Sequence, residues 1–195
     1  MSAGTGYSAN FCLNCGTALA LLTQDEDGGP KQRLRCPACG WTHWNNPTPV
    51  LAAIVECSDR GGQVLLARNA AWTGRMFALI TGVMEAGETP EEGIAREVAE
   101  ETALTVERLS LVGVYDFQRM NQLLVVFHAV AHGEVRLSPE LAEYKLYAPE
   151  DLRCWRAGTG YGLAAWLHSR GIEPQFIELP PRPDAAATAE CGVRR

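Results

Sequence analysis

Three glutamates, Glu97, Glu100 and Glu101, lie close together in a segment that has the pattern of a helix. On a helix with 3.6 residues per turn they share an arc of roughly 100°, next to an apolar stripe that would face a core. Clustered carboxylates repel one another unless a cation lies among them, and hard oxygen ligands suit Mg²⁺ or Mn²⁺. The segment could therefore bind divalent ions and, through them, phosphate oxygens.

The same helix also fits a plainer interpretation. Glu92, Arg96 and Glu100 follow one another at i, i+4 spacing, which is typical of ion pairs on a solvated helix surface. The helix start is well marked, because Thr89 can cap, Pro90 suits the first helical position, and Glu92 completes a capping box. We therefore expect a helix from Pro90, and its acidic face alone does not decide between metal binding and surface charge.

The wider sequence pattern favours metal binding over plain surface charge. Gly82 is followed after five residues by Glu88, and after seven more by the run REVAEETAL that begins at Arg96. Six specified residues at fixed offsets, each at about 7% usage, arise by chance on the order of 10⁻⁷ per start position. The pattern resembles the Nudix box, the signature of enzymes that hydrolyse nucleoside diphosphates linked to another moiety. Ala103 stands where that family has Gly, so either the helix ends differently or its last residue carries some strain.

Site residues follow from the clustered carboxylates and from this resemblance. We expect Glu97 and Glu101 to be the main ligands of Mg²⁺ or Mn²⁺, with Glu100 sharing the site. The resemblance implies a further ligand from the Gly82 carbonyl and a positioning role for Arg96 through a carboxylate such as Glu88. Glu101, Glu100 and Glu140 are all candidates for the general base. Glu140 looks like the place where relatives carry an extra metal-binding carboxylate, with Glu143 less favoured.

Four cysteines form a second motif near the start of the chain. Cys12 and Cys15 belong to one C-x-x-C-G knuckle, and Cys36 and Cys39 to another, twenty residues further on. This spacing is typical of a zinc ribbon, in which four thiolates close a tetrahedral structural site. A redox motif or a disulfide pair fits less well, because each knuckle lies among loop residues and nothing marks the chain as secreted. His43 is expected to be a surface or packing residue.

The chain should therefore contain two units and a tail. We expect the zinc ribbon over residues 8–46, too small to bury a core without metal, and a larger domain over residues 49–178. Asn45–Pro49 reads as an extended joint, and residues 179–195 read as a mobile tail. The larger domain should be α/β, a Nudix α/β/α sandwich with a mixed sheet. Its expected elements are strands Val50–Cys57, Gln63–Arg68, Ala78–Thr81, Val106–Phe117, Gln122–Ala131 and Leu141–Ala148, and a second helix over Tyr161–Ser169.

Composition limits the partners. The chain has 195 residues, 47% of them hydrophobic, and a net charge of −6. An acidic chain without a basic stripe is poorly suited to a phosphate polymer, so we expect a scaffold or dimer-contact role for the ribbon rather than nucleic-acid binding. No signal peptide or membrane span is evident, so a cytoplasmic protein, compatible with a homodimer, is expected. Cys57, Cys154 and Cys191 should be reduced packing or tail residues.

The order of ribbon, joint and box looks like the NADH pyrophosphatase branch of the Nudix family over residues 10–150. That branch carries an SQPWPFP element after the box, which the stretch Tyr115–Asn121 does not match. NADH, FAD and ADP-ribose-like substrates therefore all stay open. Tyr115 or Phe117 could stack on a base and Arg119 could meet phosphate, although aromatics at strand ends more often belong to the core. His128, in mid-strand, is expected to be a satisfied core histidine.

Two non-enzymatic alternatives remain. A Nudix-like domain could bind a nucleotide without hydrolysing it and act as a sensor, although a pure binder has no need to keep the glutamates and Arg96 together. A nucleic-acid-binding protein organised around the ribbon is disfavoured by the net charge.

Overall fold

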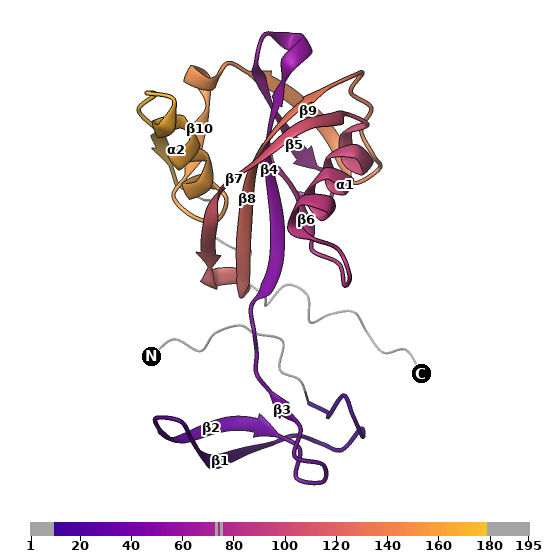
Figure 1. Ribbon diagram of the computed structural model, residues 1–195, viewed down its shortest axis with the longest axis vertical. Helices are drawn as coiled ribbons and strands as arrows, with labels where there is room; N and C mark the ends of the chain where they lie inside the picture. Colours follow the sequence, from indigo (N-terminus) through magenta and orange to yellow (C-terminus); the bar gives the residue numbers. More distant parts are fainter. Residues whose placement is uncertain (1–9, 73, 75, 179–195) are drawn as a thin grey trace.

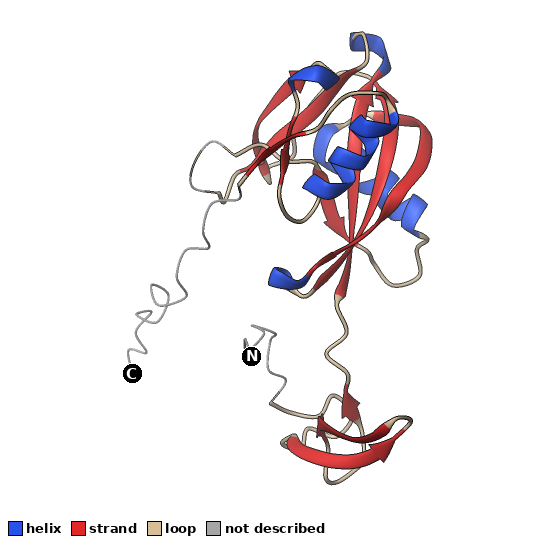
Figure 2. Cartoon of the chain, turned by 90° about the vertical axis from the view of Figure 1, so that its left-hand side faces the viewer, coloured by secondary structure: helices blue, strands red, loops and turns tan. Residues whose placement is uncertain are grey.

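The computed structural model describes residues 10–72, 74 and 76–178, and Figures 1 and 2 show their arrangement. Cys191 and the predicted tail lie outside the described residues, as do the first two residues of the predicted ribbon range.

A mixed sheet forms the centre of the larger domain (Figure 1). Its strands run in the order β7 (Thr105–Phe117), β8 (Gln122–His132), β4 (Thr48–Cys57), β5 (Gln63–Asn69), β9 (Leu141–Tyr147), and β6 (Ile80–Val83) pairs with the first half of β4. β4 and β8 are parallel over their whole shared length, whereas the other pairs are antiparallel. The predicted mixed sheet is confirmed.

The two helices cover opposite faces of this sheet (Figures 1 and 2). Alternate residues of a strand point to opposite faces, and in β4 both sets are apolar. Leu51, Ala53 and Val55 belong to the cluster that contains residues of α1 (Pro90–Thr102), while Val50, Ala52 and Ile54 belong to the cluster that contains residues of α2 (Gly160–Ser169). A strand buried on both faces reads as a continuous apolar run, as β4 does. The expected α/β/α sandwich is confirmed.

Several bounds differ from those expected. β4 begins at Thr48, two residues before the predicted start, so Pro49 lies inside the strand. β6 lies two residues later than the predicted Ala78–Thr81, and Ala78 forms only an isolated bridge with Ala67. The small parallel sheet of β10 (Arg153–Trp155) and β11 (Gln175–Ile177) was not predicted, since three-residue strands leave too short a pattern to recognise. Three short 3₁₀ turns complete the domain: η1 (Ser58–Arg60), η2 (Gln118–Met120) and η3 (Pro149–Asp151).

The first part of the chain folds as a three-stranded antiparallel sheet. It consists of β1 (Ala20–Glu26), β2 (Gly29–Arg35) and β3 (Thr42–His43), and it is seen below the central sheet in Figure 1. After β3 the chain passes directly into β4. Among the described residues, no helix is long and apolar enough to cross a membrane.

Candidate active site and metal centre

The α1 helix begins as its sequence predicts. Thr89 accepts a hydrogen bond from the Glu92 amide at 3.2 Å, and the Glu92 carboxylate accepts one from the Thr89 amide at 2.9 Å. This reciprocal capping box, with Pro90 at the first helical position, confirms the predicted helix start. The cap fixes the end of the loop that carries Glu88, immediately before the helix.

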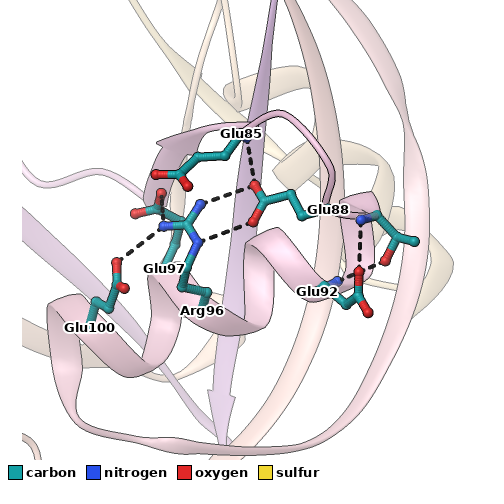
Figure 3. A network of polar contacts seen from close by, with 7 residues as sticks. Glu85, Glu88, Glu92, Arg96, Glu97 and Glu100 are labelled. Atoms are coloured by element: carbon teal, nitrogen blue, oxygen red, sulfur yellow. Dashed lines mark hydrogen bonds and ion pairs between the residues drawn. The ribbon is translucent and has the colours of Figure 1, made fainter.

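Arg96 holds that loop to the helix (Figure 3). Its Nε and Nη2 donate to the two carboxylate oxygens of Glu88 at 3.1 and 3.0 Å, and the amide of Glu85 donates to Oε1 of Glu88 at 2.7 Å. A two-pronged contact of this kind fixes direction as well as distance. The hydrogen bond from Arg96, followed by that from the Glu85 amide, keeps the pKa of Glu88 below its ordinary value. Glu88 is therefore an anchor for the loop.

The same guanidinium also contacts two of the predicted metal ligands. Nη1 of Arg96 donates to Glu97 at 2.8 Å and to Glu100 at 3.1 Å (Figure 3). The side chain of Glu97 is only 14% exposed, whereas that of Glu100 is 61% exposed. Contacts with Glu88, then Glu97 and Glu100, raise the pKa of Arg96 above its ordinary value, so this cation is permanent. It offsets part of the negative charge that the cluster concentrates.

Gly82 touches the cluster directly. A Cβ atom built on Gly82 would lie 1.9 Å from the carboxylate carbon of Glu97, which is closer than real atoms approach. Only glycine leaves Glu97 room to lie against the backbone of β6 at this position. The fixed Gly82 of the sequence pattern is thereby explained by a close approach of strand and helix.

Glu101 lies on the buried side of α1, with a relative exposure of 9%. Burial, together with the charges of Glu97, Glu140 and Glu100, raises the pKa of Glu101 to about 7. Glu140 directly precedes β9, and its backbone carbonyl accepts a hydrogen bond from the Ala70 amide at 2.8 Å. The fold thus brings the charge of Glu140 near Glu101 on the helix, although these two glutamates are far apart in the sequence.

The carboxylates are gathered but do not converge on one point. Among residues 10–72, 74 and 76–178, the four cysteines are the one group of three or more His, Cys, Asp or Glu side chains placed to hold a metal ion, with their Sγ atoms all within 4.8 Å of one another. Arg96 engages Glu97 and Glu100 at one side of the helix, while Glu101 faces the core side. The donor set still suits a hard divalent cation in chemistry and charge.

The end of α1 shows how the chain accommodates Ala103. Its φ of 59° and ψ of 13° place it in the left-handed region, and its amide donates to the Ala99 carbonyl. The second expected alternative therefore holds: the helix keeps a left-handed cap, and the backbone of Ala103 carries strain because the residue has a Cβ.

The sulfurs of the four cysteines form the second centre. Sγ distances of 3.5 Å (Cys12–Cys39), 3.5 Å (Cys15–Cys36) and 3.7 Å (Cys15–Cys39) are close to the edge of about 3.8 Å that Zn–S bonds of about 2.3 Å require in a tetrahedron. The two knuckles match, because the amide of Gly16 donates to the Cys12 carbonyl and that of Gly40 to the Cys36 carbonyl. The arrangement closes all four positions, which favours a structural metal.

The predicted substrate residues lie elsewhere in the fold. Tyr115 and Phe117 are partly buried and pack against the core cluster on the α2 face, opposite the face that α1 covers. Arg119 lies in the turn η2 that follows. Glu143, the less favoured metal candidate, contacts Arg68 across the β5–β9 pair at 3.6 Å. The structure therefore does not bring the aromatic pair together with the glutamates of α1.

Sequence reasoning missed two features that depend on tertiary contacts. The first is the hydrogen bond from the Glu85 amide to Glu88, which comes from the backbone and so cannot be recognised from residue types. His128, expected to be satisfied, meets Glu56 at 2.7 Å from Nε2 to Oε2, and Arg170 donates to the same carboxylate at 2.6 Å. These three residues lie on β4, β8 and the C-terminal end of α2, so no local pattern connects them.

The capped helix with its glutamates and Arg96, the α/β/α sandwich and the four-cysteine knuckles together define a two-unit protein, in which a small metal-binding ribbon precedes an α/β/α domain with an acidic helix. The NUDIX domain model matches residues 47–167, and the model described as Nudix N-terminal, a zinc ribbon, matches residues 10–45. The chain therefore belongs to the Nudix family.

Relatives and solved structures agree with this assignment. The chain is 33% identical over 163 residues to the NAD-capped RNA hydrolase NudC of Mycobacterium tuberculosis, covering 78% of this chain and 50% of that protein. It is also 33% identical over 119 residues to the NAD-capped RNA hydrolase NudC of Pseudomonas aeruginosa, covering 61% and 40%. The chain thus spans half or less of the length of these relatives. A NUDIX hydrolase structure from Nitrosomonas europaea superposes with a TM-score of 0.66 at 25% identity, covering 88% of this chain and all of that one.

Proposed function

We propose that this chain is a divalent-metal-dependent pyrophosphohydrolase that cleaves a nucleoside diphosphate linked to another moiety. The observation that carries the proposal is the α1 cluster, in which Arg96 ties Glu88 of the loop to Glu97 and Glu100 of the helix, and Glu97 lies against Gly82 of β6. Membership of the Nudix family and the names of the relatives support hydrolysis as the activity.

For the substrate, we propose a dinucleotide pyrophosphate of the NAD type. The two curated relatives are named for hydrolysis of NAD-capped RNA, in which such a pyrophosphate joins two nucleosides. A substrate that carries RNA therefore stays open for this chain. FAD and ADP-ribose contain the same kind of bond and belong in the same test.

The residues have distinct proposed roles. Glu97, Glu100, Glu101 and Glu140 would hold Mg²⁺ or Mn²⁺, and the Gly82 carbonyl would add a ligand. Such an ion would supply positive charge for the diphosphate and lower the pKa of the attacking water. Arg96 and Glu88 hold the loop so that the carboxylates keep their positions. Because Arg96 already engages Glu97 and Glu100, Glu101 and Glu140 are better placed to accept the proton of the attacking water.

Hydrolysis should be measured with Mg²⁺ on NADH, FAD, ADP-ribose and a dinucleoside polyphosphate. We expect a nucleoside monophosphate to be released from at least one of them. Glu101→Gln should lower kcat by at least about 100-fold while the protein stays folded, because a general base or metal ligand is worth that much or more. Glu91→Gln, on an exposed residue of the same helix, is the matched control and should keep its activity.

Two results would contradict the proposal. One is full activity of Glu101→Gln. The other is tight binding of these nucleotides by the wild type without any turnover, which would favour a nucleotide sensor built on the Nudix fold.

A further inference from the structure

A cavity of about 350 Å³ lies where the zinc ribbon meets the larger domain. We call it the joint pocket; its lining includes Trp41, His43, Trp44, Asn45, Asn46 and Asn121. Its volume falls within the range of about 300–1,000 Å³ that is usual for small-molecule sites. Figure 1 shows the segment concerned, between β3 and β4. The Nudix motif does not involve any of these residues.

Three aromatic rings line the joint pocket. The rings of Trp41 and His43 lie 6.0 Å apart between centroids and are tilted by 34°. Trp44 is 56% exposed. Exposed rings of this kind are suited to stacking on a flat heteroaromatic ligand.

The remaining wall offers hydrogen-bonding groups on a fixed backbone. Asn45 and Asn121 both have a φ of 51°, and the side chain of Asn121 donates to Oδ1 of Asn45 at 3.3 Å. The carbonyl of Asn121 accepts from the amide of Thr48 at 2.9 Å. These contacts connect the η2 turn of the larger domain to the end of the ribbon. Amide side chains beside aromatic rings can recognise the polar edge of a base.

The ribbon sheet places positive charge beside the pocket. Lys31, Arg33 and Arg35 alternate along β2 and so share one face, on which Glu26 is the acidic residue of the paired strand. The guanidinium carbon of Arg33 lies 4.8 Å from the centroid of the Trp44 ring. Glu26 pairs with both Arg33 and Arg35, and the three cations and one carboxylate leave this face with a net charge of +2, although the whole chain is acidic.

A buried cation lies directly behind the wall. Arg35 is 7% exposed and donates to Oγ1 of Thr42, another lining residue, at 2.6 Å. Its Nε is the one buried side-chain polar atom without a hydrogen-bond partner in the described part of the chain. Because Nη2 of Arg35 pairs with Glu26, the attraction for an anionic ligand comes from the net charge of the whole face rather than from Arg35 alone.

β4 connects the joint pocket to the start of the loop that precedes α1. Thr48 lines the pocket, and the carbonyl of the next residue, Pro49, accepts from the Met84 amide at 3.2 Å. Met84 leads directly into the loop that carries Glu85 and Glu88.

We propose that the joint pocket binds a nucleobase of a phosphorylated nucleotide, with Trp44 stacking on the base and the basic face of β2 attracting the phosphate. This assignment rests on the proposed function for its link to the substrate, and it gives the ribbon a role in substrate recognition.

The test is calorimetric binding by the full zinc-loaded chain without added Mg²⁺, so that no hydrolysis takes place. The probes are AMP, an adenylate RNA hexamer and ribose 5-phosphate, which lacks a base. Trp44→Ala should weaken binding of both base-bearing probes by roughly tenfold, as expected for loss of one stacking platform, and leave ribose 5-phosphate unchanged. Leu21→Ala, an exposed apolar residue of β1 outside the pocket, is the matched control.

His43→Ala serves as a second variant if Trp44→Ala alters the zinc content or the circular dichroism. Tighter binding of the hexamer than of AMP would identify a nucleotide strand as the ligand, whereas equal binding would identify a single nucleotide. Equal affinity of wild type and pocket variants, or no binding of either base-bearing probe, would overturn the assignment. Because the assay does not depend on turnover, its failure is distinct from failure of the hydrolysis experiment.

Discussion

At the scale of single residues, two arginines organise carboxylates on opposite faces of the sheet. Arg96 fixes Glu88 and the metal-ligand candidates beside α1, and Arg170 fixes Glu56 beside α2. Arg170 also lies over the ring of Trp166, with 4.6 Å from the guanidinium carbon to the ring centroid, and Trp166 in turn lies beside His128. The second group has a structural role, because it ties the C-terminal end of α2 to the two parallel central strands.

This group predicts a pH dependence of stability. Burial lowers the pKa of His128 below its ordinary value of 6.5, and the Arg170 and Arg108 charges act in the same direction, although Glu56 opposes them. The unfolded chain therefore binds a proton that the folded chain does not. The free energy of unfolding should fall as the pH decreases from 7.5 through about 6.5, the pKa of an unperturbed histidine.

Urea denaturation at pH 7.5 and 5.5 would measure this effect. His128→Asn should show a smaller loss of stability between the two pH values than the wild type. His168→Asn, on an exposed residue of α2, is the control and should behave like the wild type. An equal pH slope in wild type and His128→Asn would show that His128 does not titrate differently in the folded state.

At the scale of elements, α1 is well capped at its start and strained at its end. The capping box satisfies the first amides, whereas Ala103 adopts a left-handed conformation that disfavours a side chain. The helix that carries the candidate ligands is therefore stabilised at its N-terminus and strained at its C-terminal cap, where glycine would be more stable than Ala103.

Ala103→Gly should stabilise the larger domain. The left-handed conformation costs a residue with a Cβ about 1–2 kcal/mol, and the greater freedom of glycine in the unfolded chain offsets about half of that. We expect a net gain of about 0.5–1 kcal/mol in urea denaturation. Ala99→Gly, at an exposed position inside the same helix, should instead cost about 1 kcal/mol. A loss of stability in Ala103→Gly would contradict the strain argument.

The elements that sequence reasoning predicted well are those with local signals. The start of α1 is defined by Thr89, Pro90 and Glu92, and the long strands β7 and β8 were placed to within one residue at each end. The candidate ligands on α1 and the four cysteines also come from fixed local spacings.

The rest depends on contacts between distant segments. The approach of Glu140 to Glu101 requires β9 to pair with β5, and the joint pocket requires the η2 turn with Asn121 to meet Asn45. Neither pairing has a local signature in the sequence. The contact of Glu97 with Arg96 likewise has no local signature, whereas the contact of Glu100 with Arg96 is the i, i+4 pair that the sequence indicated.

At the scale of the whole molecule, the ribbon and the larger domain are held together by different forces. The two apolar core clusters consist of residues from Val50 onward, so the ribbon contributes to neither. A unit of this size without its own core depends on metal binding for its folding free energy.

Cys36→Ser should therefore affect the two units differently. We expect the zinc content to fall from about one per chain towards zero and the ribbon to become sensitive to protease, because three ligands no longer close the tetrahedral site. The unfolding midpoint of the larger domain should change little. Leu13→Ala, an 83% exposed residue of the first knuckle, should keep its zinc. Unchanged zinc content in Cys36→Ser would contradict the assignment of the four cysteines as a metal site.

The parallel pairing of β4 with β8 has a consequence for biosynthesis. Glu56 on β4 and its contact His128 on β8 are 72 residues apart, so the central strand leaves the ribosome well before its main neighbour. At roughly 5–20 residues per second, this delay is on the order of ten seconds. During that time the apolar strand β4 of the nascent chain has no β8 to pair with along one edge. The ribbon has by then been synthesised with all four cysteines and can already bind its metal ion.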